Sequence, residues 1–223
     1  MSRARPDPAQ GVFETLLVGD GHARALDAHL ARLEGSVRAL YGLPLPPDTA
    51  ARVTERAAAA GGDRRVRVDV LPRDGRLDVA ITLSGVPARA PVTLSPLEVP
   101  GGLGAHKWRD RTLVEGDRDG ATPLIVDADG SVLEAAWANL WVLDGDSLTT
   151  PPLDGRILPG VTRARLLAVA PRLGLRVREA PIAHAAGTLF LTSALRLAVP
   201  ASLGGRPTAE QIATVDRIAA ALR

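Results

Sequence analysis

The sequence predicts an α+β protein of two domains, a small N-terminal α+β domain and a larger C-terminal domain with a mainly antiparallel or mixed sheet. Residues 64–84 contain two stretches of alternating apolar and polar side chains around a PRDG turn, which is typical of a β-hairpin. Residues 27–41 carry apolar side chains at three- and four-residue steps, which predicts a helix. The segment 85–91, GVPARAP, is rich in Gly and Pro and lacks periodicity. We therefore expect it to link a domain at 1–84 to a domain at 92–223.

The first domain is expected to hold two strands, two helices and the hairpin, in this order. Residues 11–18, GVFETLLV, are apolar and partly β-branched, and the GDGH turn after them leads to a short strand that ends at Leu26. Asp27 is the expected N-cap of the first helix, which ends at Gly42 and the Pro-rich stretch behind it. The second helix is expected over 48–60.

The second domain is expected to begin with a strand at 92–98, followed by the Gly-rich segment PGGLGAHKW and a short polar helix. The stretches PLIVD, SVLEA and WANLWVL indicate antiparallel strands joined by tight turns. A long loop, TPPLDGRILPG, should lead into a helix at about 161–173. Further strands are expected at 175–180 and 188–193, and Thr208 should cap a terminal amphipathic helix.

Composition excludes several classes of protein. The chain has 223 residues, no Cys and no apolar run near the roughly 18 residues of a membrane span. Its N-terminus lacks the apolar core of a signal peptide. We therefore expect a cytoplasmic protein that does not contact a membrane and has no metal site.

The charge balance argues against a nucleic-acid partner. The sequence pI is 9.8, but the formal net charge is only +2. Three Trp, two Phe and one Tyr, with charges mixed along the chain, do not make the basic surface with interleaved aromatic side chains that nucleic acids require. We expect a small molecule as the ligand.

Only one of the 27 Lys and Arg residues is a Lys, Lys107. Arg replaces Lys readily on a solvated surface, but a guanidinium cannot lose its proton to attack a carbonyl as an amine does. Lys107 lies in GLGAHKWRDR beside His106, Arg109 and Arg111, whose positive charge would lower its pKa and favour a neutral, reactive amine. It is therefore a candidate for Schiff-base chemistry. The alternative is that Lys107 is an accidental surface residue.

Glu134 ends the apolar stretch SVLEA. A buried carboxylate needs a partner, and the protonated ring nitrogen of a cofactor is such a partner. The alternative is an ordinary strand-end Glu that faces water.

Two motifs are typical of anion binding. LPGVTR places Gly160 just before a helix, whose free N–H groups and dipole suit a phosphate, although a plain helix capped by Thr162 is the alternative. LTSALR ends a strand with two hydroxyls and then Arg196, and suits the other side of an anion. Arg32, in HLARL, is either a surface residue or a buried phosphate ligand.

In combination these motifs resemble a known family. GVFETLL, HLARLEGSV, HKWRDR, VLEAAWANLW, TPPLDGRILPGVTR and FLTSALR occur in the order typical of the class IV aminotransferase family, the fold-type IV pyridoxal-phosphate enzymes. The resemblance runs from about Gly11 to about Pro200. HKWRDR, TPPLDGRILPG and SALR are more similar to the 4-amino-4-deoxychorismate lyase branch than to the amino-acid transaminases, whose Lys is usually followed by a Gly-Asn-Tyr element.

The resemblance implies the D-amino acid aminotransferase-like fold, pyridoxal 5′-phosphate as cofactor and a homodimer. It implies that Lys107 forms the Schiff base and moves the proton, and that Glu134 pairs with the pyridine nitrogen. The implied phosphate ligands are Arg32, Val161, Thr162, Ser193 and Ala194. The implied substrate contacts are Asp110, Arg111 and Arg196. His29 and Asn139 match motif positions and are expected to make structural hydrogen bonds.

Three functions follow from the resemblance. The first is a lyase that converts 4-amino-4-deoxychorismate to 4-aminobenzoate and pyruvate. The second is a class IV aminotransferase of the branched-chain or D-amino acid type. However, the Tyr that often hydrogen-bonds the phenolic oxygen of the cofactor in transaminases has no counterpart at Thr112. The third is a degenerate homologue without catalysis, and the survival of Lys107 in a chain with no other Lys argues against it.

Overall fold

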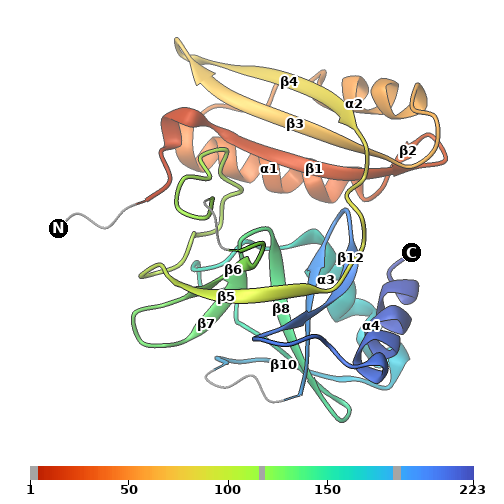
Figure 1. The fold of residues 1–223 in the computed structure, drawn as a ribbon. Helices are drawn as coiled ribbons and strands as arrows, with labels where there is room; N and C mark the ends of the chain where they lie inside the picture. The colour runs from red at the N-terminus through yellow and green to blue at the C-terminus, as the bar shows by residue number, and fades with distance from the viewer. Residues whose placement is uncertain (1–4, 116–118, 183–186) are drawn as a thin grey trace. The chain divides into compact units, whose positions relative to one another are not determined.

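The computed structural model describes residues 5–115, 119–182 and 187–223 (Figure 1). The chain divides into two compact units. Unit 1 comprises Met1–Pro87 with His106–Leu113, and unit 2 comprises Ala88–Ala105 with Val114–Arg223. The first boundary, after Pro87, falls within the Gly- and Pro-rich segment 85–91.

Unit 1 is built on an antiparallel sheet with two helices on one face. In sheet order the strands are β2 (His22–Ala23), β1 (Val12–Gly19), β3 (Arg64–Arg73) and β4 (Arg76–Ser84). The helices are α1 (Leu26–Tyr41) and α2 (Thr49–Ala58), and a short 3-10 helix, η1 (Pro8–Gln10), precedes β1. Alternate side chains of β1 and β3 pack against the helices in one apolar core, as the alternating sequence predicts.

The N-cap of the first helix is not Asp27, the residue expected from the sequence. Its N-cap is Ala25, in a left-handed conformation and without a side-chain capping bond, and Asp27 lies in the first turn. There a carboxylate still interacts favourably with the helix dipole. The second helix and the hairpin formed by β3 and β4 agree with the expected elements within two residues at each end.

Unit 2 contains a mixed sheet that closes on itself. Its strands are β5 (Val92–Glu98), β6 (Thr122–Val126), β7 (Val132–Ala135), β8 (Ala138–Asp144), β9 (Ser147–Thr150), β10 (Arg176–Glu179), β11 (Thr188–Ser193) and β12 (Leu197–Ser202). The sheet order is β10-β9-β8-β11-β12-β5-β6-β7, and β7 also pairs with β8. This last pairing joins β8, β11, β12, β5, β6 and β7 into a closed ring. The predicted α+β fold class is confirmed.

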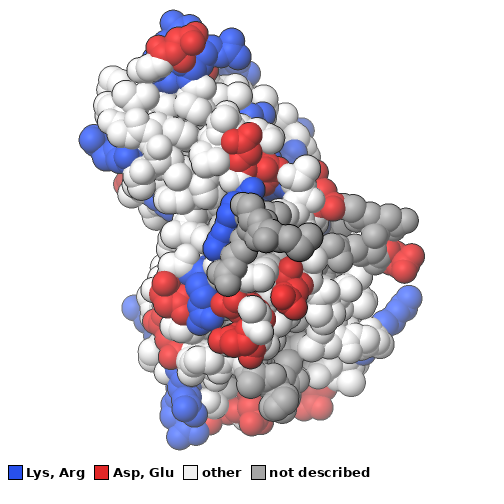
Figure 2. All heavy atoms as spheres, turned by 90° about the vertical axis from the view of Figure 1, so that its left-hand side faces the viewer, with Lys and Arg blue, Asp and Glu red and all other residues white. Residues whose placement is uncertain are grey.

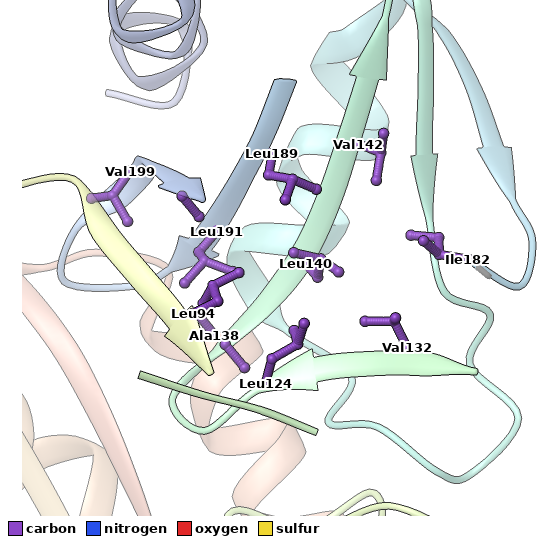
Figure 3. Packing of buried hydrophobic residues seen from close by; sticks show 12 residues of the cluster. Leu94, Leu124, Val132, Ala138, Leu140, Val142, Ile182, Leu189, Leu191 and Val199 are labelled. Atoms are coloured by element: carbon purple, nitrogen blue, oxygen red, sulfur yellow. The ribbon is translucent and has the colours of Figure 1, made fainter. Parts of the chain in front are cut away.

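The ring of unit 2 has apolar side chains on both of its faces. Leu94, Leu124, Leu140 and Leu191 point into the ring and form one core with their neighbours (Figure 3). The outer face of β8 and β11 packs against α3 (Val161–Val169), the 3-10 helix η2 (Ala170–Leu173) and α4 (Ala209–Ala221). Thr208 caps α4 with a full capping box, as predicted.

Residues 106–113 pack with unit 1, although we expected them in the second domain. Val12 of β1 forms an antiparallel bridge with Trp108, and the Phe13 N–H donates to the Lys107 carbonyl at 2.9 Å. Main-chain bonds between distant segments of the chain leave no composition signal, so a division at a single linker could not include them.

The short polar helix expected after PGGLGAHKW is absent from the described residues of this segment. Pairing with β1 extends the chain around Lys107, and the Asp110 carboxylate then accepts the Thr112 N–H at 3.0 Å. These contacts hold the chain in an extended stretch followed by a turn, so no run is left for a helix before residue 115.

Two strands were not expected from the sequence, β9 and β12. β9 has only four residues. In β12, Pro200 argues against a central strand because proline has no N–H to donate. The structure tolerates Pro200 because the pairing of β12 with β5 begins only at Ala201.

Surface charge is relevant to a nucleic-acid partner, and the length and hydropathy of the helices are relevant to a membrane. Figure 2 shows Lys and Arg interspersed with Asp and Glu on the face that it draws, rather than one continuous basic surface. Among the described residues, no helix is long and apolar enough to cross a membrane.

The closed ring predicts a large cost for truncating Leu140, which is fully buried at its centre. Leu140→Ala should lower the free energy of unfolding by about 2–5 kcal/mol, because it removes buried methyl groups and leaves a cavity. Leu153, which is 49% exposed, is the matched control. A urea titration measures the free energy of unfolding of both variants. Leu153→Ala should change this free energy by less than about 0.5 kcal/mol. Equal effects of the two substitutions would contradict the packing of the ring.

Candidate active site

Lys107 is held by main-chain contacts with β1. Its carbonyl accepts the Phe13 N–H, and the neighbouring Trp108 bridges Val12. The Lys107 Nζ lies 4.8 Å from the centre of the Phe13 ring. Lys107 is the only Lys of this protein. Its backbone is therefore positioned by β1, and its side-chain amine lies near the Phe13 ring.

His106 contacts α1 and the neighbouring Trp108 ring. Its Nδ1 lies 3.0 Å from the Ser36 Oγ on α1, and its ring meets that of Trp108 edge to face at 5.2 Å. Burial lowers the pKa of His106, so its ring is neutral near pH 7. The positive charge that the sequence led us to expect from His106 beside Lys107 is thus not supplied.

Arg32 makes a two-pronged ion pair with Glu14 of β1. Its Nε donates to Oε1 at 2.7 Å and its Nη2 donates to Oε2 at 2.8 Å. His29, one helical turn earlier on α1, contacts Oε2 of the same carboxylate at 2.8 Å through Nδ1. Glu14 is 1% exposed and the Arg32 side chain 11%. Arg32 is therefore a largely buried residue of unit 1 rather than a surface residue.

The Glu14 carboxylate stays ionised at low pH. Burial raises its pKa, but the Arg32 charge and the hydrogen bonds from His29 and Arg32 more than offset this, and the pKa falls to about 2. Sequence reasoning missed Glu14. The signal was there, since a Glu inside the apolar strand GVFETLLV requires polar partners, and HLARL offers a His and an Arg at i and i+3.

Asp110 and Arg111, the expected substrate contacts after Lys107, lie in unit 1. The Asp110 carboxylate accepts hydrogen bonds from the Thr112 hydroxyl, the Asp7 N–H and the Thr112 N–H. These bonds, the Thr112 hydroxyl first, lower the pKa of Asp110. Asp110 therefore shapes the turn that follows Lys107.

Glu134 is buried in unit 2, with 4% of its surface exposed. Its Oε1 and Oε2 each lie 3.3 Å from the Leu158 N–H, and Oε2 lies 3.4 Å from the Asn139 Nδ2. These contacts are long for hydrogen bonds to a carboxylate. The alternative of a strand-end Glu that faces water is excluded.

Asn139 connects the strand of Glu134 to the loop before α3. It lies opposite Glu134 in the pairing of β7 with β8, and its Nδ2 donates to the Leu158 carbonyl at 2.9 Å. A Cβ on Gly160 would lie 1.9 Å from the Asn139 Oδ1. Only glycine permits this close approach, which gives Gly160 a steric role at the start of α3. Asn139 thus makes the structural hydrogen bonds expected of it.

The N-terminus of α3 has no side-chain cap. Its N-cap is Gly160, which offers no side-chain capping bond, and the first turn contains no acidic residue. Thr162 is buried and is the second residue of the helix, so the alternative of Thr162 as cap is wrong. Backbone N–H groups and the helix dipole at such an end suit a phosphate.

The end of β11 lies next to Asn139 of β8. Thr192 pairs with Asn139 in the sheet, and its Oγ1 accepts the Trp141 Nε1–H at 2.9 Å, so this hydroxyl supports the fold. Ser193 and Ala194 follow at the strand end. The Arg196 guanidinium stacks on Trp137 at 4.4 Å, and partial burial lowers the pKa of Arg196.

The predicted residues thus fall into two groups. Unit 2 assembles Glu134, the start of α3 and the end of β11 around Asn139. Unit 1 holds Lys107, Arg32, Asp110 and Arg111.

A second feature that sequence reasoning missed is a link made by Arg156. Its guanidinium binds Asp127 at 2.9 Å and Asp154 at 2.7 Å, and its carbonyl accepts the Gly104 N–H. The Gly101 N–H and Arg156 lower the pKa of Asp127 to about 2. Arg156 therefore ties the Gly-rich loop that precedes Lys107 in the chain to the loop that precedes α3.

Comparisons with known proteins show the family of the chain. The chain matches the amino-transferase class IV family over residues 11–106 and 115–203. A fold IV transaminase from Curtobacterium pusillum superposes with a TM-score of 0.82 at 26% identity, covering 96% of this chain and 84% of that chain. A 4-amino-4-deoxychorismate lyase from Pseudomonas aeruginosa superposes with a TM-score of 0.74, covering 96% of this chain and 92% of that chain. At 23% identity the latter likeness shows the fold alone.

A shorter sequence match points to another relative. A branched-chain-amino-acid aminotransferase of Escherichia coli (strain K12) is 38% identical over 56 residues. The aligned stretch covers 25% of this chain and only 18% of that protein.

The buried Glu14 carboxylate predicts a pH-dependent contribution to stability. Because its pKa is lowered from 4.5 to about 2, the ionised form stabilises the fold above pH 4.5, and this stabilisation is lost as the pH falls through about 2. Glu14→Gln should therefore lower the free energy of unfolding by about 3 kcal/mol at pH 7, and the deficit should shrink toward pH 2. Urea titrations at several pH values measure this.

Glu55→Gln, on an exposed position of α2, is the matched control and should change stability little. A deficit of Glu14→Gln that stays constant from pH 7 to pH 2.5 would show that Glu14 is not held ionised by Arg32.

Proposed function

Since the chain belongs to the class IV aminotransferase family, whose members depend on pyridoxal 5′-phosphate, we propose that it is a lyase that converts 4-amino-4-deoxychorismate to 4-aminobenzoate and pyruvate. It is an enzyme of the class IV pyridoxal-phosphate aminotransferase and lyase family, and the choice of the lyase reaction is our proposal.

The residues present fit the cofactor. The uncapped N-terminus of α3, with Val161 and Thr162, offers N–H groups and a hydroxyl to a phosphate. The buried Glu134 carboxylate, which lies within 3.4 Å of the Asn139 Nδ2 and 3.3 Å of the Leu158 N, suits a protonated pyridine nitrogen. Ser193, Ala194 and Arg32 are the further phosphate ligands that we propose.

Bound pyridoxal phosphate supplies an electron sink for negative charge on the substrate carbon next to the amine. Glu134 would keep the ring nitrogen protonated, and Asn139 holds Glu134 and the α3 loop together. Lys107 would carry the cofactor covalently through Nζ and, once released, take up and return a proton. The start of α3 would orient the cofactor by its phosphate.

One observation carries the choice of the lyase over the transaminase. The chain has a single Tyr, Tyr41, and its hydroxyl donates to the Pro8 carbonyl at 2.8 Å. A transaminase arrangement in which a Tyr bonds the phenolic oxygen of the cofactor therefore has no Tyr to use. The HKWRDR, TPPLDGRILPG and SALR motifs support the same choice.

The second candidate is an amino-acid transaminase. The likeness to the Curtobacterium pusillum transaminase and the local match to the branched-chain enzyme favour it. A degenerate homologue is disfavoured, because Lys107 and the buried Glu134 are both present. Substrate contacts by Asp110 and Arg111, and a homodimer, remain predictions of the resemblance.

Lys107→Arg should abolish covalent attachment of the cofactor and leave the fold intact, because Arg keeps the charge but cannot act as the nucleophile. Borohydride reduction followed by mass spectrometry should find the cofactor on the wild type and not on the variant. Circular dichroism should be the same for both proteins.

A double variant controls for nonspecific labelling. Arg178 is exposed on β10, so Lys107→Arg with Arg178→Lys returns one Lys to the chain at the surface. This variant should also carry no cofactor after reduction. Covalent cofactor on Lys107→Arg would overturn the assignment of Lys107.

The lyase itself is tested by product analysis. Protein loaded with pyridoxal phosphate is mixed with enzymatically generated 4-amino-4-deoxychorismate, with Lys107→Ala as the blank. Pyruvate and 4-aminobenzoate, formed by the wild type alone, are the expected products. Unchanged substrate with cofactor bound would overturn the lyase in favour of the transaminase, which a screen of amino donors then tests.

A further inference from the structure

Three segments of unit 2 meet at the ion pair of Arg156 with Asp127. The Arg156 Nη1 donates to the Asp127 Oδ2 at 2.9 Å, and the Asp127 Oδ1 accepts the Gly101 N–H at 2.8 Å. The segments are the Gly-rich stretch 99–104 after β5, the turn 127–131 between β6 and β7, and the loop 151–160 before α3. One ion pair therefore connects all three.

Further contacts of Arg156 hold the same segments. Its Nη2 lies 2.7 Å from the Asp154 carboxylate, within the loop before α3, and its carbonyl accepts the Gly104 N–H at 3.1 Å. The side chain of Arg156 is 25% exposed and that of Asp127 is 14% exposed. Because water reaches this pair only in part, it is screened less than a surface salt bridge.

The backbones of two of these segments approach closely at Gly102. A Cβ on Gly102 would lie 2.1 Å from the Arg156 carbonyl oxygen. Any side chain at residue 102 would therefore push the two segments apart. Gly104 has a similar left-handed φ, +82° against +67°, but a Cβ there would come no nearer than 3.9 Å to the Gly155 carbonyl oxygen. The tight approach is thus a property of Gly102.

Each of the three segments leads to a residue that we propose for the cofactor. Lys107 follows the Gly-rich stretch by three residues. Glu134 lies on β7, directly after the turn 127–131. Val161 begins α3, five residues after Arg156. Movement of these segments would therefore move the groups that follow them in the chain.

From this geometry we propose that Arg156 is a positioning residue for pyridoxal phosphate. By holding the three segments, it keeps Lys107, Glu134 and the start of α3 where the cofactor needs them. A reacting group that is displaced by about 1 Å can lose much of its rate, so this restraint matters for attachment. The inference rests on the proposed function, because it takes Lys107 as the point of attachment. It gives Arg156 a role in function as well as in the fold.

The rate of covalent attachment tests this without turnover. The protein is stripped of cofactor, pyridoxal phosphate is added back in excess, and attachment is followed by absorbance and confirmed by borohydride reduction and mass spectrometry. Arg156→Gln should lower the rate constant at saturating cofactor by about tenfold or more. A loss of folded protein alone would lower the amplitude and leave this rate constant unchanged. The rate constant therefore separates positioning from stability.

Two aspartates near Arg156 provide a milder variant and its matched control. Asp154 lies 2.7 Å from the guanidinium and Asp129 lies 3.9 Å from it, and both side chains are exposed. Asp154→Asn weakens one contact of Arg156 and should lower the rate constant by about threefold or more. Asp129→Asn removes the same charge and should stay within about twofold of the wild type. This pair decides the matter if Arg156→Gln does not fold.

Gly102→Ala disturbs the same place without a change of charge. It should lower the rate constant by about tenfold or more, because the added methyl group forces Gly102 away from Arg156. Gly104→Ala has a similar cost in φ and no close contact, so it should stay within about twofold of the wild type. Wild-type rate constants for Arg156→Gln and Gly102→Ala would overturn the proposal, as would equal losses in Asp154→Asn and Asp129→Asn.

The outcome is separable from that of the proposed function. Slow attachment in Arg156→Gln, in a protein whose wild type releases no 4-aminobenzoate, would overturn the lyase reaction alone. Release of 4-aminobenzoate by the wild type, with attachment that does not depend on Arg156, would overturn this inference alone. A wild type that attaches no cofactor would overturn the assignment of Lys107 and this inference with it.

Discussion

The organisation of unit 2 depends on one side chain, Asn139. Its amide donates to the Leu158 carbonyl, and its oxygen lies where any side chain at residue 160 would have to be. The same residue is opposite Glu134 on β7 and Thr192 on β11. A buried carboxylate, a helix N-terminus and a strand end are thus brought to one place by a single amide, which can donate and accept at the same time. The closure of the ring by β7 and β8 puts Asn139 in this position.

Two carboxylates in this protein, Glu14 and Asp127, are held by arginines. Glu14 is paired by Arg32, and Asp127 by Arg156, and both carboxylates have a pKa of about 2. A planar guanidinium makes two parallel bonds to a carboxylate, which fixes direction as well as charge. Arg163 of α3 is fully buried, and its Nη2 donates to the Pro151 carbonyl and to the Glu179 carboxylate. These arginines set the positions of loops and strands.

Sequence periodicity predicts the elements well and the contacts between distant segments poorly. The hairpin of β3 and β4, the capping box at Thr208 and the strand of Glu134 follow from local patterns. The pairing of residues 107–109 with β1, and the Arg156 link between two loops, are long-range hydrogen bonds that leave no local pattern. Glu134, Asn139 and Gly160 carry motif signals because their chemistry is unusual for their position.

Because Arg supplies every other basic side chain of the Lys and Arg type in this chain, the Lys at position 107 requires an explanation. The structural tasks described above, from Glu14 to Asp127, need a cation that stays protonated and binds in a plane, and Arg performs them better than Lys. The Phe13 ring contacts both kinds of cation, because the Arg67 Cζ lies 3.8 Å and the Lys107 Nζ 4.8 Å from its centre. Were a positive charge all that this ring required, Arg would serve at both positions. The covalent bond that we propose at residue 107 requires an amine that can give up its proton, which a guanidinium does not do, and this requirement would account for the Lys.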